Sequence, residues 1–89
     1  ELQRRHQADC SAWVAQVARL LKPGGRLYIL VGDSVVGEQF IDGAAPLLHA
    51  AQAAALTLVA RAAAERPHYL RTSAELPPRH EHLLHFERT

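Results

Sequence analysis

An acidic residue and a hydroxyl residue follow the most apolar short segment of the chain. Asp33 and Ser34 come directly after the run Leu-Tyr-Ile-Leu-Val at positions 27–31 and Gly32. In open α/β sheets, ligands bind outside the carboxyl ends of the strands. We therefore predict that Asp33 and Ser34 lie on the substrate side of a sheet. The alternative interpretation is that Asp33 only caps the turn.

Three histidines near the C-terminus carry nitrogen atoms that could bind a metal. His80, His82 and His85 lie in one short segment together with Glu81. In a strand, His80 and His82 share one face and His85 points to the other, which separates the third ligand from the first two. A zinc site needs its ligands on a common side, so we predict no metal site here.

The segment 66–79 combines an aromatic ring, a histidine and a cation. His68, Tyr69 and Arg71 could stack on, or pair with, single-stranded or flipped bases, so they are candidate nucleic-acid contacts. The alternative is a solvated connector, since ten Lys+Arg against nine Asp+Glu provide no basic field for a phosphate backbone. We assign no catalytic residue to the chain.

The composition describes one globular unit. The 89 residues are 48% hydrophobic and 21% charged, and no apolar run reaches the ~18 residues of a membrane span. We therefore expect no membrane partner. Cys10 is the single cysteine, which excludes an intramolecular disulfide and favours a cytoplasmic location. The chain opens on Glu1 and contains no methionine, so we expect an excerpt of a longer protein.

Helical spacing predicts a first helix over about residues 2–21. Cys10, Trp13 and Val17 recur on one side of it, which predicts Trp13 as its anchor on the sheet and Cys10 as an inert core thiol. The run Lys-Pro-Gly-Gly at 22–25 then ends the helix. Residues 26–33 follow as a strand. Its apolar part is continuous, which is typical of a strand covered on both faces, as in a parallel sheet.

The remaining elements alternate in the same way. Residues 34–43 predict a loop, followed by a helix that Asp42 caps and Pro46 begins. Residues 56–62 are ambiguous: propensity favours a continued helix, whereas the architecture favours a strand, and we choose the strand. Residues 66–79 predict a loop and residues 81–87 a short final strand. This order predicts the back half of an open α/β sheet, with a parallel strand–helix–strand step and an antiparallel final strand.

Two passages carry a resemblance to a known family. Residues 20–29, LLKPGGRLYI, resemble the passage that leads into the fifth strand of class I S-adenosylmethionine-dependent methyltransferases. Val31-Gly32-Asp33 and the closing segment EHLLHFER at 81–88 are similar to the DNA methylases of the N4-cytosine or N6-adenine type. The resemblance implies the C-terminal half of a Rossmann-like methyltransferase sheet, ending in a helix, a sixth strand and an antiparallel seventh strand. One departure is Ala55, where the family often has a glycine before its sixth strand.

The family's cofactor loop, ribose-binding acid and Asn/Asp-Pro-Pro-aromatic motif do not occur among the 89 residues. Leu-Pro-Pro-Arg at 76–79 lacks both the amide or acid and the aromatic residue of that motif. The resemblance therefore implies a partial domain that lacks the cofactor-binding half. S-adenosylmethionine would bind the full-length protein and not this chain alone, and the methyl acceptor would be an amine, with DNA or RNA as a partner.

Two further expectations concern the chain by itself. The strand at 27–31 would have an unpaired edge without its missing neighbours, so we expect the isolated chain to be unstable or to form homo-oligomers through that edge. The rival functional classes are a self-contained small α/β interaction or regulatory module and a fragment of a small-molecule methyltransferase.

Overall fold

The chain folds into two helices and five strands. The computed structural model describes residues 1–66 and 78–89. The elements in chain order are α1 (Leu2–Leu20), β1 (Arg26–Gly32), β2 (Ser34–Val36), β3 (Gln39–Ile41), α2 (Ala45–Ala53), β4 (Leu56–Glu65) and β5 (His80–Arg88). The helix at 2–21, the strand at 26–33 and the strand chosen at 56–62 are thus confirmed within a few residues, as is the final strand.

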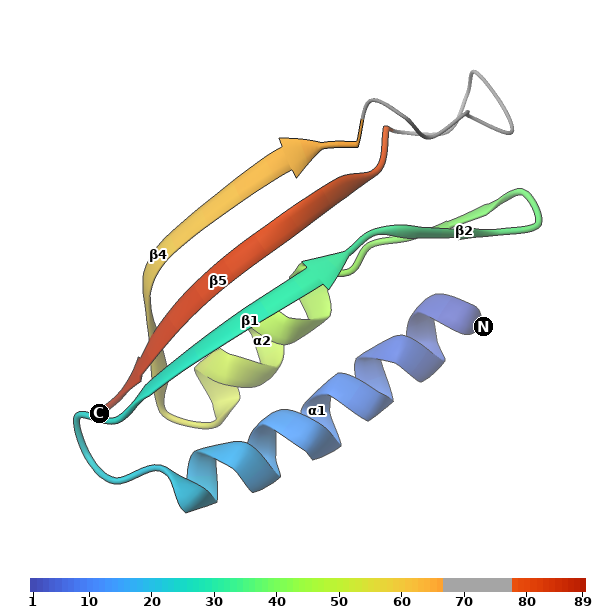
Figure 1. The fold of residues 1–89 in the computed structure, drawn as a ribbon. Coiled ribbons are helices and arrows are strands. Elements are labelled where there is room, and N and C mark those ends of the chain that lie inside the picture. The colour runs from blue at the N-terminus through green and yellow to red at the C-terminus, as the bar shows by residue number, and fades with distance from the viewer. Residues whose placement is uncertain (67–77) are drawn as a thin grey trace.

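The main sheet has three strands in the order β1-β5-β4 (Figure 1). β5 is antiparallel to β1, with Tyr28 opposite His85, and antiparallel to β4, with Leu56 opposite Arg88. β1 and β4 therefore run in the same direction, and β5 lies between them in the opposite direction. The antiparallel final strand is confirmed. The expected parallel sheet is not formed within these residues, because β5 separates the two strands that run in the same direction.

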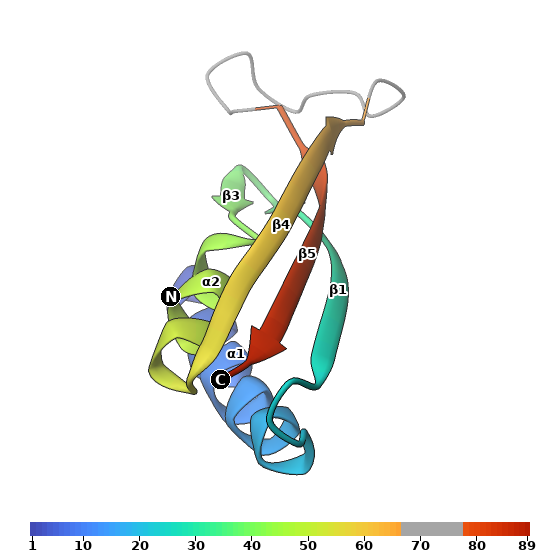
Figure 2. The ribbon, with the colours of Figure 1, turned by 90° about the vertical axis from the view of Figure 1, so that its left-hand side faces the viewer.

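Both helices cover the same face of this sheet, so the molecule has two layers (Figure 2). On the other face Tyr28 is 60% exposed and Leu30 71% exposed, and Leu83 lies opposite Leu30. The Tyr28 and His85 rings stack there, with their centroids 4.2 Å apart. The prediction that β1 is covered on both faces is therefore wrong for the described residues, since α1 and α2 lie on a single side.

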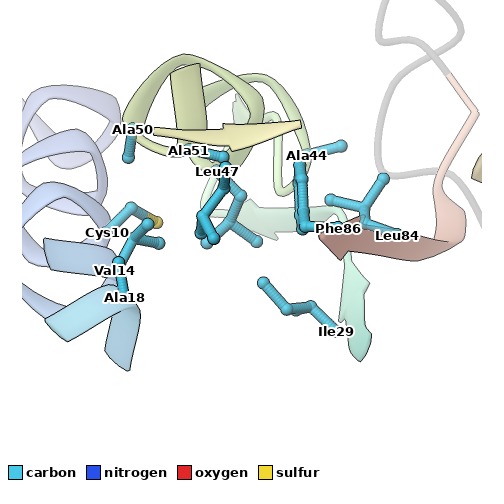
Figure 3. Packing of buried hydrophobic residues seen from close by; sticks show 11 residues of the cluster. Cys10, Val14, Ala18, Ile29, Ala44, Leu47, Ala50, Ala51, Leu84 and Phe86 are labelled. Atoms are coloured by element: carbon cyan, nitrogen blue, oxygen red, sulfur yellow. The ribbon is translucent and has the colours of Figure 1, made fainter. Parts of the chain in front are cut away.

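The hydrophobic core lies between this helical layer and the sheet (Figure 3). Val14 of α1 and Leu84 and Phe86 of β5 are its most completely buried large side chains. Cys10 is buried beside them as expected, and burial, followed by the charge of Asp9, raises the pKa of its thiol. Trp13, in contrast, is 47% exposed, so the prediction that it anchors α1 on the sheet is wrong. The smaller side chains one helical turn apart on α1, at positions 10, 14 and 18, do this instead.

The expected loop at 34–43 is largely a β-hairpin. β2 and β3 pair in an antiparallel fashion, with Val35 opposite Phe40, and Gly37 and Glu38 form the two-residue turn. Gly37 has φ +62°, which fits the first central position of a type II′ turn. β-Branched and aromatic side chains on both sides of this turn stabilise the extended conformation.

The start of α2 agrees with the sequence prediction in part: the helix begins at Ala45 with Ala44 as its N-cap residue, and Asp42 lies two residues earlier. The carboxylate of Asp42 accepts hydrogen bonds from the N–H groups of Ala44 and Ala45 at 2.9 and 3.1 Å, and Pro46 lies in the first turn. α2 ends before Ala55, whose φ of +59° makes it the only described residue other than glycine with a positive φ. None of the helices in residues 1–66 and 78–89 is long and apolar enough to cross a membrane.

Candidate functional site

Asp33 is buried at the carboxyl end of β1, with 5% of its surface exposed. Its Oδ1 accepts hydrogen bonds from the Gly43 N–H at 2.9 Å and from His82 Nε2 at 3.0 Å, and its Oδ2 accepts one from the His80 N–H at 3.0 Å. Burial raises the pKa of this carboxyl, but these hydrogen bonds and the His82 ring outweigh burial and leave the pKa lowered. Asp33 is therefore a buried carboxylate held in its charged form.

The Asp33 carboxylate joins three parts of the chain that are distant in sequence. Asp33 follows β1 directly, Gly43 lies just after the hairpin, and His80 begins β5. The backbone N–H of Asp33 also donates to the His80 carbonyl at 2.9 Å, which extends the β1–β5 pairing by one residue. The cluster formed by Asp33, Gly43, His80 and His82 thus fixes the carboxyl end of β1 to the start of β5. We call it the Asp33 cluster.

His82 occupies the helix-facing side of β5, and its Nε2–H donates to Asp33. Its other ring nitrogen, Nδ1, is buried and has no hydrogen-bond partner among residues 1–66 and 78–89. His80 lies nearer the surface, and its Nδ1–H donates to the Pro78 carbonyl at 3.2 Å, 3.8 Å from Asp33 Oδ2. Because the Nδ1 of His82 is buried, the Asp33–His82 pair orients side chains and does not present a base to solvent.

Two glycines allow the backbone to approach closely at this end of the sheet. A Cβ added at Gly43 would overlap the carbonyl group of Gly32. A Cβ added at Gly32 would overlap the guanidinium of Arg66, which lies across Gly32 and donates to Glu81 Oε1 at 2.9 Å. Glu81 is the β5 residue opposite Gly32. The missing side chain of Gly32 therefore makes room for the Arg66–Glu81 ion pair.

The first turns of α1 hold the other side of the cluster. Gln3 Nε2 donates to the Asp42 carbonyl at 3.2 Å, and Gln3 Oε1 accepts from the Asp42 N–H at 2.7 Å. His6 Nε2–H donates to the Gly43 carbonyl at 3.3 Å. These contacts fix the segment between the hairpin and α2, so the end of β1, the start of β5 and the starts of both helices are tied at a single place.

Asp33, Asp42 and His82 place one possible metal-ligating atom each within 4.8 Å of one another. Carboxylate oxygens and an imidazole suit several divalent cations. In this structure, however, Asp33 accepts three hydrogen bonds, Asp42 Oδ1 accepts two, and His82 Nε2 is directed at Asp33. The geometry is that of a hydrogen-bonded network that links backbone segments.

The structure places the residues predicted from the sequence in different environments. Asp33 is central to the cluster, whereas Ser34 is exposed at the start of β2. His85 lies on the opposite face from His82, as the strand alternation predicted. The candidate nucleic-acid contacts His68, Tyr69 and Arg71 lie outside the described residues.

The roles of His82 and Gly43 were not predicted from the sequence. The available signal was that His82 and His80 share a face of the final strand, but the sequence does not show that this strand pairs with β1. Once that pairing is known, the register that places Gly32 opposite Glu81 also places Asp33 opposite His80.

Comparison with protein families, with characterised proteins and with solved structures finds no match to this chain.

Proposed function

We propose that the chain is the C-terminal part of an S-adenosylmethionine-dependent methyltransferase domain. The observation that carries the proposal is the direction of the strands. β1 and β4 run in the same direction and the last strand, β5, runs against both. The resemblance at residues 20–29 implies such an ending, in which an antiparallel strand follows two strands of common direction joined through a helix.

Two backbone conformations support the proposal. Gly24 has φ +82°, and a Cβ on Gly25 would lie 2.8 Å from the Lys22 carbonyl oxygen, so the turn in the resembling passage requires both glycines. Ala55 adopts φ +59° directly before β4. Left-handed backbone favours glycine, and this is the position at which the family often has one. Ala55 therefore differs from the family's glycine in its side chain, but it keeps the left-handed backbone conformation that glycine favours.

In this proposal the chain supplies strands and a wall of the substrate pocket. The Asp33 cluster lies at the carboxyl end of β1, the edge at which open α/β sheets bind their ligands. Asp33 is buried and accepts three hydrogen bonds, so in this proposal it holds this wall in shape. S-adenosylmethionine would be bound by parts of the domain outside these residues, and close positioning of an amine against the sulfonium would provide most of the rate enhancement.

The methyl acceptor that we propose is an amine of DNA or RNA, on the similarity of 31–33 and 81–88 to amine-methylating DNA methylases. A polypeptide that retains the residues encoded ahead of Glu1 is incubated with S-adenosylmethionine labelled in its methyl group and with DNA, RNA or small amines. Label in nucleic acid is the expected result. Label only in small amines would point to a small-molecule methyltransferase, and no transfer to any acceptor would contradict the proposal.

A specific observation favours a second candidate, a self-contained interaction module. The three strands carry two helices of their own on one face and expose Tyr28, Leu30 and Leu83 on the other. Exposed apolar patches mark surfaces that bind partners. The two candidates differ in the behaviour of residues 1–89 alone, since a module should be a monodisperse monomer that unfolds cooperatively, whereas a partial domain should be unstable or associate.

A further inference from the structure

β4 is the last strand of the sheet on the side away from β1. The strand order ends at β4, and no strand in the described part of the chain pairs with its outer edge. Leu56, the first residue of β4, is buried, whereas residues 57–65 are exposed. Figure 2 shows that β4 continues beyond the stretch beside α2. Most of β4 is therefore an exposed edge strand.

The second half of β4 presents its backbone hydrogen-bonding groups in a fixed alternation. The register with β5 shifts between Leu58 and Ala60, which marks a β-bulge. Beyond the bulge, the Arg66 N–H donates to the Arg79 carbonyl at 2.9 Å, so even-numbered positions direct their N–H and C=O groups towards β5. The groups that point outward therefore belong to positions 61, 63 and 65.

Two charged residues occupy two of these three outward positions. Arg61 and Glu65 are the only charged residues of β4, and Ala63 lies midway between them. Their side chains point to the same face of the sheet, because alternate residues of a strand share a face. Arg61 and Glu65 are about 13 Å apart along the strand, too far to pair with each other. A rotation by 180° about Ala63, however, exchanges the position of the cation for that of the anion.

We infer that β4 pairs with β4 of a second copy of the chain in antiparallel register, with Ala63 opposite Ala63 on a two-fold axis. Arg61 of each copy then lies opposite the partner's Glu65, which gives the dimer two cross-strand ion pairs. The three outward positions of each copy become hydrogen-bonded pairs, and the two sheets join into one sheet of six strands. The remaining side chains of this segment are alanines, so none of them is bulky.

The charges select this register over its neighbours. An axis at Arg61 would place two guanidinium groups opposite each other, and an axis at Glu65 would place two carboxylates opposite each other. An axis at Ala62 would place Arg61 opposite Ala63, without an ion pair. A single charge in an edge strand opposes pairing. Self-pairing of β4 therefore depends on the compensation that the axis at Ala63 provides.

The edge of β1, where the sequence predicts association, lacks this symmetry. The Asp33 N–H donates to the His80 carbonyl, so the outward positions of β1 are even-numbered. They carry one cation and no acid, because they are Arg26, Tyr28, Leu30 and Gly32. The inference for β4 is also independent of the proposed function, since further strands beside β1 would leave β4 at the opposite edge of the sheet.

The test measures the mass of the polypeptide used for the methyl-transfer assay by analytical ultracentrifugation over a range of concentrations. The wild type should form a dimer reversibly, and weakly, because the paired segments are short. Arg61→Glu and Glu65→Arg should each weaken dimerisation about 10-fold or more, since each places like charges opposite each other at both ends of the pairing. Arg4→Glu makes the same change of charge at an exposed position of α1 and should leave dimerisation unchanged.

Two combinations restore opposite charges without restoring the original residues. The double variant Arg61→Glu/Glu65→Arg should dimerise like the wild type, because it exchanges the two signs. An equimolar mixture of the two single variants should form a heterodimer that has opposite charges at both ends. Failure of both combinations to dimerise would overturn the inference. A monomeric mass of the wild type at every concentration, or unchanged dimerisation of Arg61→Glu, would also overturn it.

Amide hydrogen exchange, read by NMR, locates the contact. The amides of Arg61 and Ala63 should exchange at least about 10-fold more slowly once most of the protein is dimeric. The amides of Ala62 and Ala64, which face β5, should be protected at every concentration and serve as the internal control. A dimer in which Arg61 and Ala63 exchange as fast as in the monomer would contradict the inference, since another surface would then form that dimer.

The inference and the proposed function fail in different experiments. A polypeptide that dimerises through β4 but transfers no methyl group would support the pairing and contradict the methyltransferase. Methyl transfer by a polypeptide that stays monomeric would do the opposite. The comparison of the two candidate functions in residues 1–89 is best made with Arg61→Glu, which removes association through β4.

Discussion

The Nε2 atom of His82 lies 3.0 Å from Oδ1 of Asp33, although 49 positions separate the two residues. This hydrogen bond links the end of β1 to β5, next to the place where Gly43 and His80 donate their backbone N–H groups to the same carboxylate. A buried carboxylate with three donors stabilises the arrangement that provides them and is costly to remove. The Asp33 cluster therefore stabilises the pairing of β1 with β5 at one end of the sheet.

Asp33→Asn should destabilise the chain by about 2–3 kcal/mol, because the amide carries no charge and turns a donor group toward backbone N–H donors. Asp9→Asn makes the same chemical change at an exposed position and should alter the free energy of unfolding by less than about 0.5 kcal/mol. Urea denaturation of both variants, made in the polypeptide used for the methyl-transfer assay so that the test does not require residues 1–89 to fold alone, measures the difference. Equal effects would show that the Asp33 cluster does not stabilise the fold.

The stability of the chain should fall in acid through the same residue. The hydrogen bonds at Asp33 hold its pKa below the ordinary value of 3.8. Its contribution to stability is then fully present above that ordinary value and is lost as the pH falls through the lowered pKa of the folded chain. The free energy of unfolding of the wild-type chain should decrease below about pH 4, and more steeply than that of Asp33→Asn. Parallel pH profiles for the two proteins would contradict this assignment.

Gly43→Ala and Gly32→Ala make the same chemical change but should lower the stability of the chain by different amounts. The new methyl group at position 43 would overlap the backbone of Gly32, which cannot move away without disrupting the end of β1. We expect a loss of about 1–3 kcal/mol. At position 32 it meets the end of the Arg66 side chain, which can turn away, so the loss should stay below about 1 kcal/mol. Thermal unfolding compares the two, and a larger effect at Gly32 would contradict the geometry.

Ala55→Gly should stabilise the chain by about 1 kcal/mol, since alanine is strained at φ +59° and glycine is not. Ala54→Gly provides the control one residue earlier. Ala54 has φ −101°, so glycine there relieves no strain and should lower the stability by roughly 0.5 kcal/mol. Denaturant titration measures whether each substitution raises or lowers the free energy of unfolding. A destabilised Ala55→Gly would mean that the turn before β4 has another conformation.

Local signals in the sequence predicted most elements of the fold. The turn at 22–25 and the contact of Asp42 with the start of α2 depend on backbone preferences that a few neighbouring residues determine. The strand chosen at 56–62 is different, because local propensity favoured a continued helix and the order of the elements decided for the strand that the structure shows at Leu56–Glu65. The hairpin at 34–41 was also visible in principle, as two β-branched segments around a turn that begins with Gly37. The prediction of a loop over residues 34–43 is therefore wrong for the two paired segments, Ser34–Val36 and Gln39–Ile41.

The cluster itself depends on tertiary pairing that no local pattern specifies. Asp33 was selected as a substrate-side residue from its place after a strand, which stays a prediction; its partner His82 follows only from the insertion of β5 beside β1. The exposure of Trp13 and Leu30 was not predicted from the sequence for the same reason. An apolar pattern indicates that a residue favours burial, but it does not show which element would cover that residue.

Calorimetric titration with S-adenosylmethionine is the decisive measurement for the proposed partial methyltransferase domain. Residues 1–89 alone should give no heat of binding, and the polypeptide that retains the residues encoded ahead of Glu1 should bind one equivalent. Micromolar affinity in residues 1–89 alone, or no binding by the longer polypeptide, would contradict the proposal.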